Sequence, residues 1–148
     1  MGVAMDDPYD LQRFVSAQDP VIEQVFLELQ AGRKQSHWMW FVFPQLQGLG
    51  GSPMARRFAL SSLDEARAYL RHPVLGERLR RCARLVNAVE GRSLGQIMAY
   101  PDDLKFRSCM TLFAQAGGDV QVFVDALDKY CGGEPDDRTL EILGVADL

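Results

Sequence analysis

The stretch from His37 to Gln45, HWMWFVFPQ, decides whether this chain contains a β-sheet, because no other segment has a composition that suits a strand. Its aromatic residues favour a strand, but no polar residue alternates with them, so periodicity cannot separate a buried strand from a buried helix. A strand also needs a partner, and no neighbouring segment offers one. We therefore expect a short buried helix that begins near Ser36 and ends before Pro44, whose ring disfavours helical geometry at Phe43.

Helix signals dominate the sequence on both sides of this stretch. Asp19 followed by Pro20 is typical of a helix start, with the aspartate as N-cap. The spacing of Ser62 and Glu65 predicts a capping box before the next apolar run. Asp119 is placed to cap a helix that ends at a pair of glycines. These signals alternate with apolar residues at helical spacing, which predicts a series of amphipathic helices.

The predicted fold class is mainly α, with at most a minor β ribbon. No long low-complexity linker or internal repeat divides the chain, so we expect one compact multi-helix domain over residues 9–144. Residues 1–8 are expected to form a disordered or extended N-terminus, and residues 145–148 a C-terminal tail.

Composition and charge narrow the range of functions. The chain has 148 residues, a hydrophobic fraction of 47%, a net charge of −4 and an isoelectric point near 5.1. These values are typical of a globular domain and argue against general nucleic-acid binding. No apolar run approaches the ~18 residues of a membrane span, which predicts a soluble protein that does not bind a membrane.

The cysteines and histidines predict neither a disulfide framework nor a metal site. The three cysteines lie more than 20 residues apart, and two histidines are too few for a familiar zinc spacing. An odd cysteine count without a signal peptide is typical of the reducing cytoplasm. We therefore expect a cytoplasmic protein with free thiols, no metal and no cofactor. Nothing in the sequence indicates an oligomeric state.

Three long motifs carry a resemblance to a known family: GRKQSHWMWFVFPQ at residues 32–45, AYLRHPVLGERL at 68–79 and PDDLKFRSCMTLF at 101–113. With the glycine-rich GLGGS at 48–52, they closely resemble the DUF1810 family, small bacterial and fungal proteins of uncharacterised function, over about residues 9–143. Members often carry the label calpastatin, which fits this chain badly because calpastatin is a disordered repeat inhibitor. The family is also distantly similar to the YbiA-like (NADAR) N-glycosidases, which implies a nucleotide- or ADP-ribose-like small-molecule ligand.

The resemblance marks ten positions of the chain. They are Lys34, His37, Trp38, Trp40, Gln45, Asp103, Lys105, Ser108, Met110 and Thr111. The chain departs from the family pattern at Phe106, where leucine is expected, and at Cys109, where serine is commoner. Neither departure removes a group with obvious chemistry.

Residues 103–116 separate into two faces when they are placed on a helix at 100° per residue. The apolar arc holds Phe106, Cys109, Met110, Leu112, Phe113 and Ala116, and a polar stripe holds Ser108, Thr111 and Gln115. Lys105 falls at the edge of the apolar arc. Either its stem covers core surface while its ammonium reaches solvent, or the ammonium enters a pocket.

Each of the other marked positions also has two interpretations. His37 is either a hydrogen-bonded core or rim residue or a titratable group at a pocket mouth near Lys34. Trp38 and Trp40 either fill the core or stack on the ring of a ligand. Asp103 is either a carboxylate at a helix start or a catalytic group. The GLGGS loop is either a flexible surface loop or a loop whose backbone N–H groups bind an anionic ligand.

Two functions fit these residues. The first is a small enzyme that hydrolyses the N-glycosidic bond of a nucleotide- or ADP-ribose-like ligand, with Asp103, Lys105 and His37 as catalytic residues. Asp103 would stabilise an oxocarbenium-like state or activate water, or Lys105 would form a Schiff base at C1. The expected ligand contacts are Lys34, Trp38, Trp40, Gln45, Ser108 and Thr111.

The second function is a non-catalytic ligand-binding or protein-interaction domain in which the same residues form a packed centre. The enzyme and the non-catalytic domain differ in whether the predicted polar side chains lie around one pocket. A shared pocket requires the side-chain ends of His37, Gln45, Lys105 and Ser108 to lie within about 10–12 Å of one another.

Overall fold

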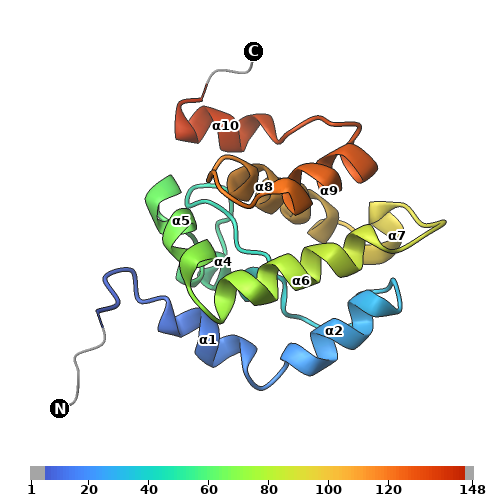
Figure 1. Cartoon of the computed structure of the whole chain (residues 1–148), viewed down its shortest axis with the longest axis horizontal. Helices are drawn as coiled ribbons and strands as arrows, with labels where there is room; N and C mark the ends of the chain where they lie inside the picture. Colours follow the sequence, from blue (N-terminus) through green and yellow to red (C-terminus); the bar gives the residue numbers. More distant parts are fainter. Residues whose placement is uncertain (1–5, 146–148) are drawn as a thin grey trace.

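The computed structural model describes residues 6–145, and these residues form ten helices and no β-sheet (Figure 1). In chain order the helices are α1 (Gln12–Gln18), α2 (Ile22–Gln30), α3 (Met39–Val42), α4 (Pro53–Arg57), α5 (Leu63–Arg71), α6 (Leu75–Asn87), α7 (Leu94–Met98), α8 (Asp102–Ala114), α9 (Gln121–Cys131) and α10 (Asp137–Leu143). The prediction of a mainly α domain is confirmed. The predicted domain boundaries stay predictions, because residues 1–5 and 146–148 lie outside the described range.

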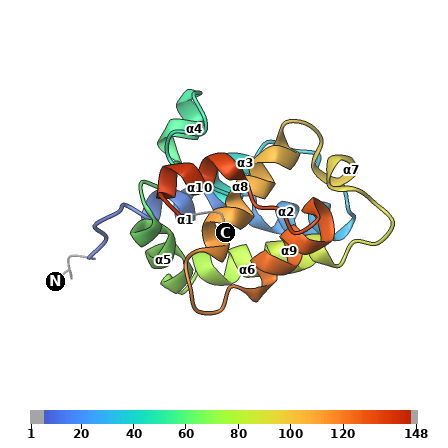
Figure 2. The same ribbon diagram turned by 90° about the horizontal axis from the view of Figure 1, so that it is seen from above.

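Helix α8 lies at the centre of the fold, with α5, α7, α9 and α10 packed around it (Figure 2). Its apolar arc is buried as the helical spacing predicts, at Phe106, Cys109, Met110, Leu112 and Phe113, and Ala116, two residues past the end of the helix, is buried as well. Phe106 packs edge-on against Phe43, with ring centroids 5.0 Å apart, and Phe113 lies 5.4 Å from the ring of Tyr69. The middle of α8 is therefore core, and its two ends lie nearer the surface.

The aromatic stretch of residues 37–45 contains a short helix, α3, as predicted. Trp38, Met39, Phe41, Val42 and Phe43 are buried, whereas His37 is exposed and Trp40 is half-buried. The segment packs into an aromatic core rather than pairing as a strand. Over residues 6–145, β pairing is limited to one isolated bridge between Leu46 and Leu60.

The polypeptide between the two bridge residues projects from the body of the domain and carries α4 (Figure 2). Its base is held by two backbone hydrogen bonds: Gln47 N–H donates to the Leu60 carbonyl at 2.7 Å, and Leu60 N–H donates to the Gln45 carbonyl at 2.9 Å. Helix α4 contains no buried residue. This excursion, residues 47–59, is therefore fastened at its base and weakly packed at its tip.

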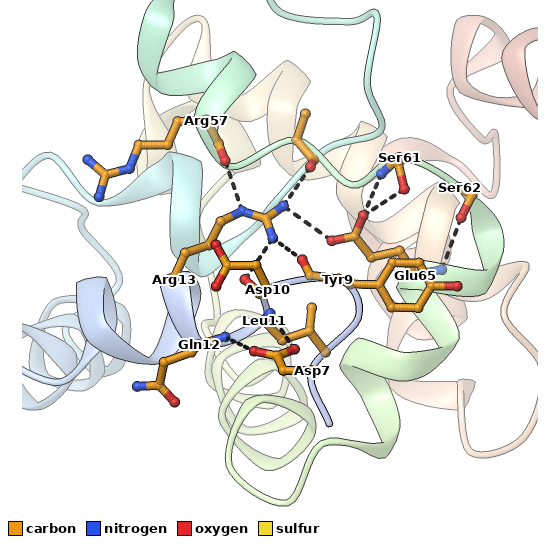
Figure 3. Close-up of polar contacts among 11 residues, drawn as sticks. Asp7, Tyr9, Asp10, Leu11, Gln12, Arg13, Arg57, Ser61, Ser62 and Glu65 are labelled. Atoms are coloured by element: carbon orange, nitrogen blue, oxygen red, sulfur yellow. Dashed lines mark hydrogen bonds and ion pairs between the residues drawn. The ribbon is translucent and has the colours of Figure 1, made fainter. Parts of the chain in front are cut away.

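The N-terminal helix is attached to the rest of the fold by Arg13 and Glu65 (Figure 3). The guanidinium donates to the carbonyls of Tyr9, Asp10, Arg57 and Ala59 and to the carboxylate of Glu65. Arginine has five N–H donors, so this set of acceptors uses all of them. The other carboxylate oxygen of Glu65 accepts from the backbone and the hydroxyl of Ser61.

The capping box predicted at Ser62 and Glu65 is only half present, because Glu65 belongs to this network. The Ser62 hydroxyl accepts from the N–H of Glu65 at 3.1 Å, so the serine cap is present. The Glu65 carboxylate does not return to Ser62 but bonds to Ser61 and Arg13 instead. The arginine comes from a helix distant in sequence, which the local spacing could not reveal.

Two further predicted caps are wrong for the same reason. Helices α2 and α9 each begin after a valine without a side-chain cap. Asp19 instead accepts from Arg78 at 2.8 Å, and the Asp119 carboxylate lies 3.7 Å from Arg80. Both arginines are on α6, and their charge attracts the aspartates away from the helix ends. A complete capping box occurs at the start of α7, formed by Ser93 and Gln96.

The junction of α5 and α6 depends on a glycine. A Cβ atom at Gly76 would lie 2.1 Å from the carbonyl oxygen of Leu70, closer than atoms approach in proteins. His72 stabilises the turn between the helices, because its Nδ1 accepts from the N–H groups of Val74 and Leu75. The motif RHPVLG therefore encodes a tight helix-to-helix connection.

No helix within residues 6–145 is both long enough and apolar enough to cross a membrane.

Candidate ligand site

Lys34 lies in the connection between α2 and α3, and its side chain is nearly buried, with 7% of it exposed. Its backbone N–H donates to the carbonyl of Ile97, which holds the connection against α7. The ammonium lies 2.8 Å from Asp102 Oδ2, donates to the Ser36 carbonyl at 2.6 Å and sits 4.9 Å from the centroid of the Trp38 ring. A buried ammonium loses its hydration and is stable only when other groups replace the water. For Lys34 these groups are a carboxylate, a backbone carbonyl and an indole ring.

Lys105 lies one turn into α8 and is bound far more loosely. Its ammonium is 3.8 Å from Asp102 Oδ1 and 5.8 Å from the centroid of the Trp40 ring. No acceptor within residues 6–145 forms a hydrogen bond with it, and 27% of the side chain is exposed. Lys105 therefore offers a cation with its donors available.

Asp102 lies between the two lysines and joins them into one group. We call Lys34, Trp38, Trp40, Asp102 and Lys105 the lysine–tryptophan cluster. Two ammonium groups and one carboxylate give this cluster a formal charge of +1. Because the cluster is only partly exposed, its interactions with an anion are screened less than they would be on an open surface.

The loop that carries Lys34 and Trp38 is ordered by the buried carboxylate of Glu28 on α2. Oε1 accepts from the backbone N–H groups of Gln35 and Ser36 at 2.7 and 2.9 Å and from Trp38 Nε1 at 3.0 Å. Oε2 accepts from the Ser36 hydroxyl and from Gln24.

These bonds change the acidity of Glu28. Burial raises its pKa, but the hydrogen bonds from Ser36, Gln35 and Gln24 lower it by more, to about 2 from an ordinary 4.5. Glu28 is therefore ionised at neutral pH and fixes the position of the Trp38 indole.

A narrow pocket adjoins the cluster. It is lined by Met39, Trp40, Phe43, Gln45, Leu46, Gly50, Ala55, Phe58 and Lys105. Its volume is about 10 Å³, room for about one water molecule. Gly50 and Ala55 come from the excursion of residues 47–59, and a Cβ at Gly50 would lie 2.6 Å from the Cβ of Ala55. The excursion thus closes the pocket above Trp40.

The backbone that leads into α8 is strained next to this cluster. Ala99 has φ 65° and ψ 162°, a region that is almost restricted to glycine. Strain of this kind persists only where the surrounding structure enforces it, and it concentrates at functional sites.

Five of the predicted site residues lie together. They are Lys34, Trp38, Trp40, Gln45 and Lys105. The carboxylate predicted for the site was Asp103, whereas the one that lies between the two lysines is Asp102. In the structure Asp103 forms no ion pair within the described residues, and its carboxylate accepts from the N–H of Leu104. The position of Asp102 three residues before Lys105, on the same helix face, was the signal that could have identified it.

The other predicted residues lie elsewhere. Exposed His37 does not line the pocket. The Ser108 hydroxyl donates to the Leu104 carbonyl of its own helix at 3.1 Å. Thr111 donates to the Arg107 carbonyl and accepts from the backbone N–H of Asp136, which attaches the start of α10. Of the four side chains expected around one pocket, Gln45 and Lys105 line it and the other two do not. No group of three or more potential metal ligands occurs within residues 6–145.

Comparisons with known proteins agree with this fold. The chain is similar to the crystal structure of the conserved hypothetical protein Rv1873 from Mycobacterium tuberculosis, with 58% sequence identity and a TM-score of 0.93. The match covers 95% of this chain and 100% of that one. No curated protein matches the chain. The family described as "Protein of unknown function (DUF1810)" matches residues 8–143. The chain therefore belongs to the DUF1810 family.

Proposed function

We propose that the lysine–tryptophan cluster binds a small anion that carries an aromatic ring, of the nucleotide or ADP-ribose class. The observation that carries this proposal is the Lys105 ammonium. It has no hydrogen-bond acceptor within the described residues, yet it lies beside a half-buried indole and a carboxylate already paired with Lys34. A phosphate would bind Lys105 while the ring stacks on Trp40.

The size of the expected affinity follows from these two contacts. A charge-assisted hydrogen bond contributes about 1.5–3 kcal/mol, and base stacking on an aromatic side chain about 1–3 kcal/mol. Their sum, about 2.5–6 kcal/mol, corresponds to a Kd between about 15 mM and about 40 μM.

Entry of a ligand requires the excursion of residues 47–59 to move. The pocket holds about one water molecule in the present structure. The part of the excursion from Gln47 to Arg56 is suited to movement because α4 has no buried residue. The return of the excursion is held in place, since Phe58 is buried and Arg13 donates to the carbonyls of Arg57 and Ala59. Glycines at positions 48, 50 and 51 add flexibility to the segment that covers Trp40.

Hydrolysis of an N-glycosidic bond is the reaction that the cluster would support. Water adds to the anomeric carbon as the C–N bond breaks, and the base leaves with a proton. We assign the stabilisation of the oxocarbenium-like state to Asp102 rather than Asp103, because Asp102 Oδ1 lies 3.8 Å from the loosely held Lys105 while its Oδ2 is paired with Lys34.

A non-catalytic packed centre is the second candidate. The small volume of the pocket and the complete pairing of Lys34 favour it. In that case the cluster only joins the α2–α3 connection to α8.

Calorimetric titration with AMP and with ADP-ribose separates these candidates. The wild type is expected to bind, and Lys105→Gln to weaken binding by about tenfold or more, the effect of one charge-assisted hydrogen bond. Lys129→Gln is the matched control, because Lys129 bonds to the end of α6 instead. Absence of binding by the wild type, or equal losses in the two variants, would refute the proposal. If binding is found, chromatography of the incubated ligands tests for release of the base, which Asp102→Asn should abolish.

A further inference from the structure

A second pocket lies at the opposite end of α8 and is lined by residues of α5, of α6 and of the turn from α8 to α9. Figure 2 shows that this turn lies beside α5 and α6. The pocket is lined by Arg67, Leu70, Arg71, Arg80, Ala116, Gly117, Gly118 and Asp119, and its volume is about 380 Å³. That volume is within the range of small-molecule sites. Since α8 spans 13 residues, this pocket is separated from the lysine–tryptophan cluster by about 20 Å along the helix.

Two of the arginines are held in place by carbonyl groups. Arg67 Nε donates to the Ala116 carbonyl at 3.0 Å, and its Nη1 donates to Asp64 at 3.1 Å. Arg80 Nε donates to the Asp119 carbonyl at 3.1 Å, and its Nη1 to the Leu70 carbonyl at 3.3 Å. Each guanidinium has five N–H donors, so each keeps three without an acceptor within residues 6–145.

Arg71 has no hydrogen-bond acceptor or ion-pair partner within the described part of the chain. It lies four residues after Arg67 on α5, so both side chains are on the same face of that helix. The pocket therefore combines two fixed guanidinium groups with a third that is available to move onto a ligand.

The charge of the pocket contrasts with that of the whole protein. Three arginines and one aspartate line it, which gives a formal charge of +2 in a chain of net charge −4. Asp119 is 82% exposed at its side chain, and its Oδ2 lies 3.7 Å from Arg80 Nε. This is a loose ion pair that an incoming anion can replace.

Backbone donors add to the positive character of the wall. Gly117 and Gly118 have φ values of 82° and 78°. The N–H groups of Gly117, Gly118 and Asp119 donate to no protein acceptor within residues 6–145. Successive free N–H groups in a turn are suited to binding an anion.

We propose that this arginine pocket binds a small molecule that carries a phosphate or diphosphate group. Guanidinium groups match phosphate oxygens in pairs, and three of them with free donors suit a dianion. Leu70 and Ala116 offer apolar contact to the remainder of such a molecule. The proposal is independent of the function assigned to the lysine–tryptophan cluster.

The test is calorimetric titration of the full chain with inorganic pyrophosphate at low ionic strength. Arg71→Gln should weaken binding by about tenfold or more, the loss of one charge-assisted hydrogen bond. Its matched control is Arg84→Gln, which removes an exposed arginine of α6 that does not line the pocket. Asp119→Asn should tighten binding several-fold by removing the competing carboxylate, whereas Asp128→Asn, elsewhere on the surface, should not.

Lys105→Gln separates the two sites and is expected to leave pyrophosphate affinity unchanged. Three results would overturn the proposal: no binding by the wild type, equal losses in Arg71→Gln and Arg84→Gln, or loss of binding in Lys105→Gln. Circular dichroism of each variant establishes that the fold is retained, and since neither Arg71 nor Asp119 has a buried side chain, the fold is expected to be unaffected.

Discussion

Replacement of Glu28 by glutamine removes the charge that orders the loop of the lysine–tryptophan cluster while it keeps the shape of the side chain. The five hydrogen bonds that the carboxylate accepts come from Gln24, Gln35, Ser36 and Trp38. A neutral amide has one oxygen where the carboxylate has two, so part of this set loses its acceptor. The variant should therefore destabilise the fold and loosen the segment around Trp38.

The free energy that the Glu28 carboxylate contributes to folding follows from its pKa. A pKa of about 2 in the folded protein and 4.5 as the ordinary value corresponds to about 3 kcal/mol of stability at pH 7. Because folding lowers this pKa, the contribution is complete above pH 4.5 and is lost as pH falls toward 2. At pH 3 about 1.4 kcal/mol remains. The difference between wild type and Glu28→Gln should shrink by about half or more between pH 7 and pH 3.

Urea denaturation followed by circular dichroism at both pH values measures this difference. Glu23→Gln is the matched control, because Glu23 is exposed on the same helix; its expected cost is below about 1 kcal/mol. A loss in Glu28→Gln that is below 1 kcal/mol at pH 7, or that is equal at pH 7 and pH 3, would refute the role given to the carboxylate.

Three other variants or reagents test the fold. Gly76→Ala should destabilise the fold by about 1–3 kcal/mol through overpacking. In the control Gly51→Ala the added methyl group meets no atom within 4 Å, so the stability should change little. Equal losses of stability in the two variants would contradict the close approach at the α5–α6 junction. Ala99→Gly should relieve backbone strain and raise the melting temperature by about 2–4 °C, and a decrease would show that the strain is absent. Burial raises the pKa of Cys82 to about 12 and that of Cys109 well above its usual range, so a thiol reagent at pH 8 should label at most the third cysteine in the folded protein and all three in urea.

Most helices and the core could be predicted from the sequence because they follow from local periodicity. For the aromatic stretch of residues 37–45 periodicity left strand and helix open, and the lack of a strand partner favoured the helix. The arc of α8 from Phe106 to Ala116 is buried as its spacing requires. The aromatic stretch around Phe41 is likewise buried and helical. In both segments the number of large apolar residues leaves no other way to remove them from water.

The polar details could not be predicted because they depend on partners distant in sequence. Asp19 and Asp119 have the local features of helix caps, but arginines of α6 attract them. Glu28 has the local features of a surface residue, and it is buried only because the α2–α3 connection folds over it. Asp102 and Asp103 are both helix-start carboxylates; Asp102 lies three residues before Lys105, but its closer ion pair is with Lys34, which is distant in sequence.

The most direct test of the lysine–tryptophan cluster as a ligand site is nuclear magnetic resonance of its two indole N–H groups. The chain contains two tryptophans, so it gives two indole signals. Trp38 is buried and bonded to Glu28, whereas Trp40 is half-buried beside Lys105. Titration with AMP or ADP-ribose to about 10 mM should shift the Trp40 signal along a binding curve with a Kd between about 40 μM and about 15 mM and leave Trp38 less changed. Lys105→Gln should need about tenfold more ligand or still more for the same shift. An unshifted Trp40 signal at that concentration, in a wild-type protein that is folded, would contradict the account.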